Sequence, residues 1–395
     1  MQQRREFVLR ALEPGANISA LCLEYRISRK TGYKWLHRFR ESGLLGLRDQ
    51  PRRKSSTAFR CSVPVSLDIV FLKQRYPSYG PKKIRRMLMD SWPASELPSL
   101  STISRVVRYA GLAKKKRRVQ RYKAGPGRKP DVAVEAPNDL WTVDFKGWWN
   151  SRNGKRCEPL TVRDEYSRFV LAIDIVDAPS IACVRPVFER IFALHGLPKA
   201  IQTDNGVPFS ASQSYSGMTQ LSAWWVALGL RFVRSRVAKP QDNGGHERMH
   251  RDMKDQLQKH PSWSPEQQQE ACDHFRRVFN WERPHQALGQ EVPASVYLNS
   301  PRPFTPGDPL LKYPADWHVR KVTKCGTMRY RRFQRSVGKA FAGQYVGVEQ
   351  LDEKRFRVWF AEVCIGVGDL PWINGLRPPG REDEQPETLD ESQEM

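Results

Sequence analysis

The sequence predicts a multidomain chain with helical units at the N-terminus, an α/β domain in the centre and a small β-barrel near the C-terminus. Three observations lead to this prediction. Apolar residues recur at helical spacing over the first 112 residues, strand-like and helix-like runs alternate between residues 140 and 280, and short strand-like runs crowd between residues 324 and 370. A chain of 395 residues is long enough for two to four such domains.

Residues 1–47 have the pattern of a helix-turn-helix unit. Ile18, Leu21 and Tyr25 follow a three-and-four spacing, and after a short break Ser28 is a suitable N-cap for a second helix. That second helix has one apolar face and one face of cationic and aromatic side chains, as expected of a helix that enters the major groove. A helical hairpin that joins two subunits is the alternative. The side chains predicted to contact DNA are Arg29, Lys30, Tyr33 and Lys34.

Residues 63–112 predict a second helix-turn-helix-like unit. Helical runs lie at 67–76, 82–90 and 102–109, and Ser101 is the expected N-cap of the last one. A purely structural three-helix bundle is the alternative. The exposed side chains predicted to contact DNA are Arg105 and Arg108.

Residues 113–136 form a linker that is rich in Lys, Arg, Gly and Pro. Its Gly and Pro content is typical of a connecting segment, and its charge indicates an arm that lies along DNA phosphates. The predicted contacts are Lys114, Lys115, Lys116, Arg117 and Arg118.

The central domain, residues 137–298, begins with strand-like runs at 140–148, 159–163 and 169–176. A helical run, a short strand at 200–203, a helix, a strand and two further helices follow in that order. This order predicts an α/β domain.

Three acidic residues of this domain stand in distinctive contexts. Asp144 lies in Trp-Thr-Val-Asp-Phe, Asp204 lies in Gln-Thr-Asp-Asn-Gly, and Glu247 follows Asn-Gly-Gly-His just inside a helix-like run. Carboxylates from two strand ends and one helix can converge, and two charges ~4 Å apart repel by roughly 4 kcal/mol at an effective dielectric constant of about 20. They therefore need a counter-charge. With no Cys or His pair expected nearby, oxygen ligands favour Mg²⁺ or Mn²⁺ over Zn²⁺, and two such ions serve in-line phosphoryl transfer.

In this order the three motifs resemble the Asp-Asp-Glu triad of the retroviral-integrase-like core found in many insertion-sequence transposases. A later stretch, 280–288, followed by Pro-Ala-Ser-Val-Tyr at 293–297, resembles the segment that closes that core. The resemblance implies a ribonuclease-H-like core with two Mg²⁺ (or Mn²⁺) ions per active site. Its catalytic residues and metal ligands would be Asp144, Asp204 and Glu247.

The interval between the second and third acidic residues departs from the family pattern. Glu247 follows Asp204 by 43 positions, a longer interval than many relatives have. The surplus is expected at 210–219, a stretch rich in Ser and Gly that is typical of a loop. Asp242 is a rival for the third ligand, but it precedes Asn-Gly-Gly and so indicates a loop residue before the helix.

The helix that carries Glu247 also carries His250, Arg251 and Lys254 at spacings of three, four and seven residues, which places them on one face. Arg251 and Lys254 are predicted to contact the DNA backbone beside the carboxylate. A Glu247–Arg251 salt bridge worth ~0.3–0.5 kcal/mol is the alternative.

The C-terminal part is expected to contain a linker at 299–323, a small basic β-barrel at 324–370 and an acidic disordered tail at 371–395. A strand face that alternates polar and core residues, without a role in binding, is the alternative. Within the barrel, the side chains predicted to contact DNA are Arg331 and Arg332.

The amino-acid composition indicates which class of molecule the protein binds. The formal net charge is +24, which favours a polyanion such as nucleic acid. No apolar run approaches the ~20 residues of a membrane span, so no membrane partner is expected. The seven cysteines are scattered without a Cys-x-x-Cys pair, which is typical of reduced thiols in the cytoplasm and argues against zinc fingers.

Together these features predict a DNA transposase of a bacterial insertion sequence, located in the cytoplasm on the nucleoid. It would bind terminal inverted repeats, hydrolyse the transposon 3′ ends and join them to target DNA by two-metal-ion phosphoryl transfer. Its partners would be double-stranded transposon ends, target DNA and a second copy of the chain, in a homodimer or higher oligomer. Two alternatives are a metal-dependent, structure-selective nuclease on the same core and a catalytically inactive DNA-binding regulator.

Overall fold

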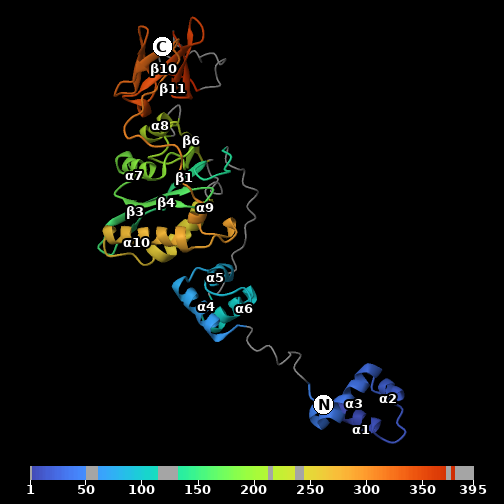
Figure 1. Ribbon diagram of the computed structural model, residues 1–395. Helices are drawn as coiled ribbons and strands as arrows, with labels where there is room; N and C mark the ends of the chain where they lie inside the picture. The colour runs from blue at the N-terminus through green and yellow to red at the C-terminus, as the bar shows by residue number, and fades with distance from the viewer. Residues whose placement is uncertain are drawn as a thin grey trace, which may run out of the picture. The chain divides into compact units, whose positions relative to one another are not determined.

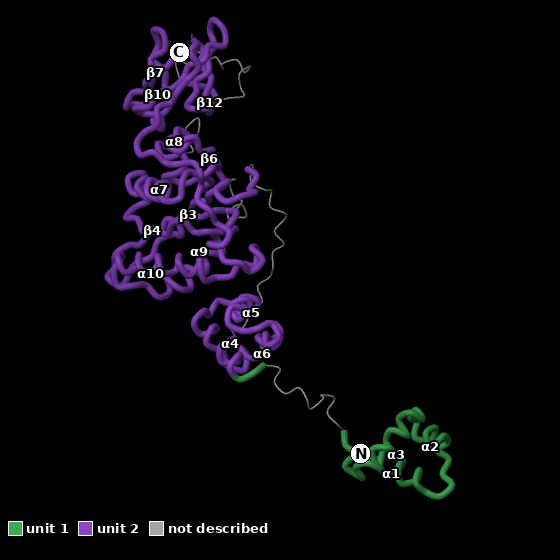
Figure 2. Tube along the Cα trace, in the orientation of Figure 1, with its two compact units in different colours: residues 1–63 green, residues 64–395 purple. Residues whose placement is uncertain are grey.

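The computed structural model describes residues 2–49, 61–113, 132–211, 217–235, 244–370 and 375–378. The chain divides into two compact units, residues 1–63 and residues 64–395 (Figure 2). Several sequence predictions lie outside the described residues: the arm from Lys114 to Arg118, the rival ligand Asp242 and nearly all of the acidic tail.

The first unit consists of three helices, α1 (Gln2–Ala11), α2 (Ile18–Glu24) and α3 (Arg29–Gly46) (Figure 1). As predicted, Ser28 is the N-cap of α3, and its side chain accepts a hydrogen bond from the Thr31 backbone at 3.2 Å. Gly43 has a positive φ of 58°, so α3 kinks there. The helices enclose a small core of Phe7, Val8, Leu21, Cys22, Leu36 and Leu47.

The second unit begins with α4 (Val63–Arg75), α5 (Pro81–Leu88) and α6 (Leu100–Tyr109). Ser101 was predicted to cap the last helix, and this prediction is wrong. The N-cap is Ser99, whose side chain accepts a hydrogen bond from the Thr102 backbone at 3.3 Å. Either serine has the right chemistry for a cap, and using the earlier one keeps Leu100 and Ser101 in the helix.

A six-stranded sheet follows, and its three longest strands are antiparallel neighbours. β3 (Arg156–Asp164) pairs with both β1 (Leu140–Phe145) and β4 (Val170–Val176), and β1 also pairs in parallel with β5 (Ala200–Thr203). β2 (Trp149–Asn150) pairs with the start of β3, and β6 (Arg231–Arg234) pairs in parallel with β5. The strand order is β2-β3-β1-β5-β6, with β4 also paired with β3, so β1 lies inside the sheet between β3 and β5.

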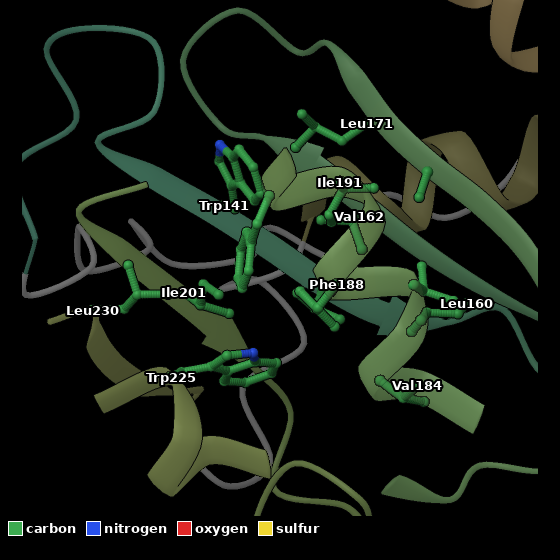
Figure 3. Packing of buried hydrophobic residues seen from close by; sticks show 14 of the residues in the cluster. Trp141, Leu160, Val162, Leu171, Val184, Phe188, Ile191, Ile201, Trp225 and Leu230 are labelled. Atoms are coloured by element: carbon green, nitrogen blue, oxygen red, sulfur yellow. The ribbon is translucent and has the colours of Figure 1, made fainter. Parts of the chain in front are cut away.

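Helices cover both faces of this sheet (Figure 1). On one face α7 (Ile181–His195) and α8 (Gln220–Ala227) enclose a core that includes Trp141, Phe188, Ile191 and Trp225 (Figure 3). On the other face, α9 (Gly244–Met253) and α10 (Pro265–Arg277) pack Met249, Met253 and Phe275 against alternate strand residues such as Val170 and Ile173. Wide helical turns continue these two helices to Gln258 and Glu282, and α11 (Pro293–Val296) ends the domain. The predicted α/β core is thus confirmed.

The C-terminal strands differ from the prediction. β7 (His318–Lys321), β10 (Tyr345–Gln350), β11 (Arg355–Phe360) and β12 (Val363–Asp369) form an open sheet in the order β12-β11-β10-β7. β8 (Thr327–Tyr330) and β9 (Phe333–Ser336) form a separate hairpin.

A closed β-barrel was predicted here, but in the described residues neither sheet closes on itself. The physical reason is that the hairpin covers the apolar face of the sheet by packing and not by strand pairing. Met328 and Tyr330 of the hairpin share a core with Val348 and Phe356, and the rings of Tyr330 and Phe356 lie 4.9 Å apart. No described helix is both long and apolar enough to cross a membrane.

Candidate metal centre and nucleic-acid interface

Asp144 lies near the end of β1, inside the sheet between β3 and β5. Its register partner on β3 is Thr161, whose hydroxyl donates a hydrogen bond of 2.7 Å to the Asp144 carbonyl oxygen. About a quarter of the side chain, 24%, is exposed. The backbone of Asp144 is therefore held within the sheet, while its carboxylate still reaches the surface.

Asp204 directly follows β5, which runs parallel to β1, so both acidic residues lie at the carboxyl edge of the sheet. Its Oδ1 accepts a hydrogen bond from the Gly206 backbone at 3.2 Å, as in a tight turn. Glu247 lies in the first turn of α9. Both side chains are exposed.

Electrostatics connects the three residues. Burial raises the pKa of Asp144 to about 7, and the negative charges of Asp204 and then Glu247 contribute to the rise. The three predicted ligands therefore repel one another in this structure. A set of hard oxygen donors that repel one another fits a divalent cation, which would relieve the repulsion.

The structure also places two histidines at Asp144, contrary to the expectation that no His pair lies nearby. Ligand atoms of Asp144, His246 and His250 all lie within 4.8 Å of one another. Burial, together with the positive charges of nearby cations, lowers the pKa of His246 far below its usual range and that of His250 to about 3. Burial thus favours the neutral form of both rings, which is the form that binds a metal ion. A spacing of four residues places His246 and His250 on the same side of a helix, which the sequence could have indicated. The sequence analysis instead assigns His250 to the helix face expected to meet DNA.

Two cations near this edge were also missed. Lys146, two residues after Asp144, donates a hydrogen bond of 3.4 Å to Gln258, and burial and the charge of Lys254 lower its pKa. Arg163 is buried, with 4% of its side chain exposed, and it forms an ion pair with Glu165. Lys146 adds a positive charge beside the carboxylates, where a phosphate would pass.

The predicted DNA contacts are exposed wherever the structure describes them. On α3 the buried Gly32 and Leu36 lie opposite the predicted face, and Tyr33 is 57% exposed. Arg331 and Arg332 lie in the turn between β8 and β9. Arg335, in contrast, is buried and donates hydrogen bonds to the backbone oxygens of Asp369 and Leu370, which indicates a structural role. The predicted contacts that are exposed are Arg29, Lys30, Tyr33, Lys34, Arg105, Arg108, Arg251, Lys254, Arg331 and Arg332.

Comparison with known families matches each part of this architecture. The integrase core domain family matches residues 134–240, and a second integrase core family matches residues 228–293. The C-terminal domain of IS481 family transposases matches residues 317–374. The chain belongs to the insertion-sequence transposases with an integrase core. Its N-terminal helices match a helix-turn-helix domain at residues 3–55 and a homeodomain-like domain at residues 31–107.

Individual relatives of this transposase agree with the family assignment. An uncharacterized protein of insertion element IS476 from Xanthomonas euvesicatoria is 26% identical over 67% of this chain and 75% of its own length. A protein of insertion element IS407 from Burkholderia multivorans is 29% identical over 49% of this chain and 66% of its own length. The Gag-Pol polyprotein of Koala retrovirus is 31% identical over 34% of this chain, which is 7% of that polyprotein.

Solved structures with some likeness include the catalytic core domain of HTLV-2 integrase in complex with magnesium, with 16% identity and a TM-score of 0.33 over 41% of this chain and 98% of that one. Another is a simian T-cell lymphotropic virus intasome, with 12% identity and a TM-score of 0.36 over 75% of this chain and 97% of that one. At these TM-scores the likeness adds nothing to the family assignment.

Proposed function

We propose that this transposase binds the terminal inverted repeats of its element, hydrolyses the 3′ ends and joins the freed 3′-hydroxyls to target DNA. The observation that carries the proposal is the position of Asp144 and Asp204 at the carboxyl ends of two neighbouring parallel strands, where the negative charges of Asp204 and Glu247 help to raise the pKa of Asp144. Such an arrangement has little structural use, because it destabilises the protein unless a cation binds.

Asp144, Asp204 and Glu247 would hold two Mg²⁺ or Mn²⁺ ions. When bound, the ions would make a water or a DNA 3′-hydroxyl more acidic and stabilise the leaving oxygen. The protein contributes placement and charge. β1 fixes Asp144 within the sheet, and Lys146 and Lys254 place positive charge where the phosphate backbone would lie.

The helical units would supply recognition. The exposed face of α3 would read the transposon end in the major groove, and Arg105 and Arg108 of α6 would add contacts. Because two ends must be cut and joined to one target while each core has one site, the active species would be a homodimer or a larger assembly on DNA.

Substitution of the triad tests this function. Asp144→Asn, Asp204→Asn and Glu247→Gln should each abolish end cleavage and strand joining on labelled duplexes, while leaving binding to the ends intact. The control is Asp177→Asn, an exposed carboxylate after β4 that should leave both activities unchanged. Activity should require Mg²⁺ or Mn²⁺ and disappear in EDTA. Strand joining by Glu247→Gln at the wild-type rate would contradict the assignment, and cleavage without any joining would favour the nuclease.

A further inference from the structure

The hydroxyl group of Thr161 organises the atoms beneath Asp144. It donates its hydrogen bond to the Asp144 carbonyl oxygen at 2.7 Å. His246 Nδ1 lies 3.1 Å from the same hydroxyl oxygen, and His250 Nε2 lies 2.9 Å from it. A threonine hydroxyl has one hydrogen and two lone pairs. Because its hydrogen goes to the carbonyl oxygen, which can only accept, the hydroxyl oxygen offers a lone pair to His250 Nε2, which is therefore a donor.

This proton count fixes the tautomer of His250. A neutral imidazole carries a proton on one ring nitrogen and a lone pair on the other. With the proton of His250 on Nε2, the lone pair lies on Nδ1. Nδ1 is 3.9 Å from Oδ2 of Asp144. The Nδ1 lone pair and a carboxylate oxygen therefore lie near each other, and both are atoms that can bind a divalent cation.

His246 belongs to the same network but differs in one respect. Its Nδ1 lies 3.1 Å from the Thr161 hydroxyl, and its Nε2 lies 3.0 Å from the Thr142 backbone oxygen and 2.8 Å from the Thr142 hydroxyl. Both nitrogens are therefore used, and the residue is fully buried. His246 therefore links α9 to β1 and β3 through hydrogen bonds. Neither of its ring nitrogens is available to bind an ion.

We propose that His250 Nδ1 is a ligand of the divalent ion that Asp144 holds, so that the metal centre contains one histidine nitrogen beside the carboxylates. The proposal rests on the proposed function, because it takes Asp144 to be a metal ligand. Thr161 sets the orientation of the ring through the other nitrogen, as hydrogen-bond partners of metal-binding histidines commonly do. A nitrogen donor favours Mn²⁺ over Mg²⁺, since Mg²⁺ prefers oxygen.

Pulsed electron paramagnetic resonance of Mn²⁺ bound to the full chain tests the proposal directly. The spectrum of the wild type should show modulation from a directly bound nitrogen, and labelling with ¹⁵N-histidine should change that modulation. His250→Gln should lose it and bind Mn²⁺ at least 10-fold more weakly, whereas Mg²⁺ affinity should change less. Thr161→Val keeps the His250 imidazole but removes the hydroxyl that orients it. This variant should bind Mn²⁺ about 10- to 100-fold more weakly.

The matched control is His246→Gln, which should keep the nitrogen modulation. Circular dichroism would verify that each variant is folded. Bound Mn²⁺ without nitrogen modulation in the wild type would overturn the proposal and leave the carboxylate triad intact, as would modulation that survives in His250→Gln. Failure of the wild type to bind Mn²⁺, with or without an end duplex, would contradict the proposed function itself.

Discussion

At the scale of single residues, the position of Glu247 depends on a glycine two residues before it. A Cβ atom on Gly245 would lie 1.9 Å from an Arg163 guanidinium nitrogen, so only glycine lets the start of α9 approach the sheet this closely. The guanidinium cannot move aside easily, because Arg163 is buried and paired with Glu165. The first turn of α9 therefore rests on a buried cation.

Gly245→Ala should reduce end cleavage by about 100-fold, since a displacement of ~1 Å at a catalytic group can cost that much. Binding to the transposon ends should persist. The control is Gly244→Ala, where a Cβ atom would meet no other atom within 4 Å. Single-turnover cleavage of a labelled end duplex measures both. Equal rates for the two variants would show that the packing of α9 on Arg163 does not set the site.

The sequence motifs correctly predicted the strand ends and the helix start on which Asp144, Asp204 and Glu247 lie, because the context of each residue defines such a position. The motifs did not predict that His246, His250 and Thr161 lie beside Asp144. A spacing of four residues places two side chains on one helix face, but it does not say whether that face meets DNA or the sheet. Only the packing of α9 against β1 and β3 decides this.

At the scale of secondary-structure elements, α3 is the clearest candidate for sequence recognition. Substituting Arg29, Lys30 and Lys34 together with Ala should remove the preference for the transposon end over random DNA, because these exposed side chains would meet base edges. Deletion of residues 114–118 should instead weaken binding to any sequence and reduce its salt dependence, since each phosphate contact contributes about −0.9 to the log–log slope. Binding titrations at several salt concentrations distinguish the two effects, and the opposite pattern would reverse the assigned roles.

The connection between α4 and α5, together with the first turn of α5, meets the closing segment of the core through aromatic and charged side chains. Tyr76 donates a hydrogen bond to Glu282, Tyr79 stacks on Tyr76 with ring centroids 4.6 Å apart, and the Lys83 ammonium lies 5.0 Å from the centre of the Tyr79 ring. Burial, followed by the charge of Arg283, lowers the pKa of Lys83 to about 7. An uncharged lysine at pH values above 7 is thus part of this junction.

The stability of the junction should therefore depend on pH. The unfolded chain binds the Lys83 proton near pH 10.5, whereas the folded chain binds it only near pH 7. The stability of the folded chain is therefore greatest above pH 10.5 and decreases as the pH falls from 10.5 to about 7. Below about pH 7 it decreases no further. Lys83→Met should raise the melting temperature relative to wild type more at pH 7 than at pH 10. Lys82→Met, which changes an exposed neighbour, should show no such difference, and parallel melting curves for all three proteins would contradict the prediction.

The architecture of the C-terminal sheet could not be predicted from the alternation of apolar and polar residues. Alternating apolar residues predicted the strands, but a barrel and an open sheet covered by a hairpin have the same alternation. The choice depends on partners distant in sequence. Ala223 and Val226 of α8 join the apolar core of the C-terminal sheet, so this sheet already has a covering surface and does not need to close on itself.

At the scale of the whole molecule, the N-terminal helices and the core lie in separate compact units of the chain. We expect cleavage in trans, in which the core that cuts one end belongs to the chain whose helices hold the other. Mixing an Asp144→Asn protein with a protein that lacks residues 1–46 should restore partial joining, although each alone is inactive. The readout is joined product, together with light scattering of the complex on DNA. No complementation, with full activity of a monomeric complex, would rule the arrangement out.

Part of the long interval between Asp204 and Glu247 is enclosed by a β-bridge. Ser210 and Met218 pair as this isolated bridge, so the two ends of the stretch between them lie side by side. Lengthening a loop that is closed at its base costs only a logarithmic entropy term, about 0.6 kcal/mol for each doubling. Insertions at this place are therefore nearly neutral for the fold and leave Asp204 on its strand end. A survey of genomes that requires a fixed distance between the second and third acidic residues will accordingly overlook active members of this family.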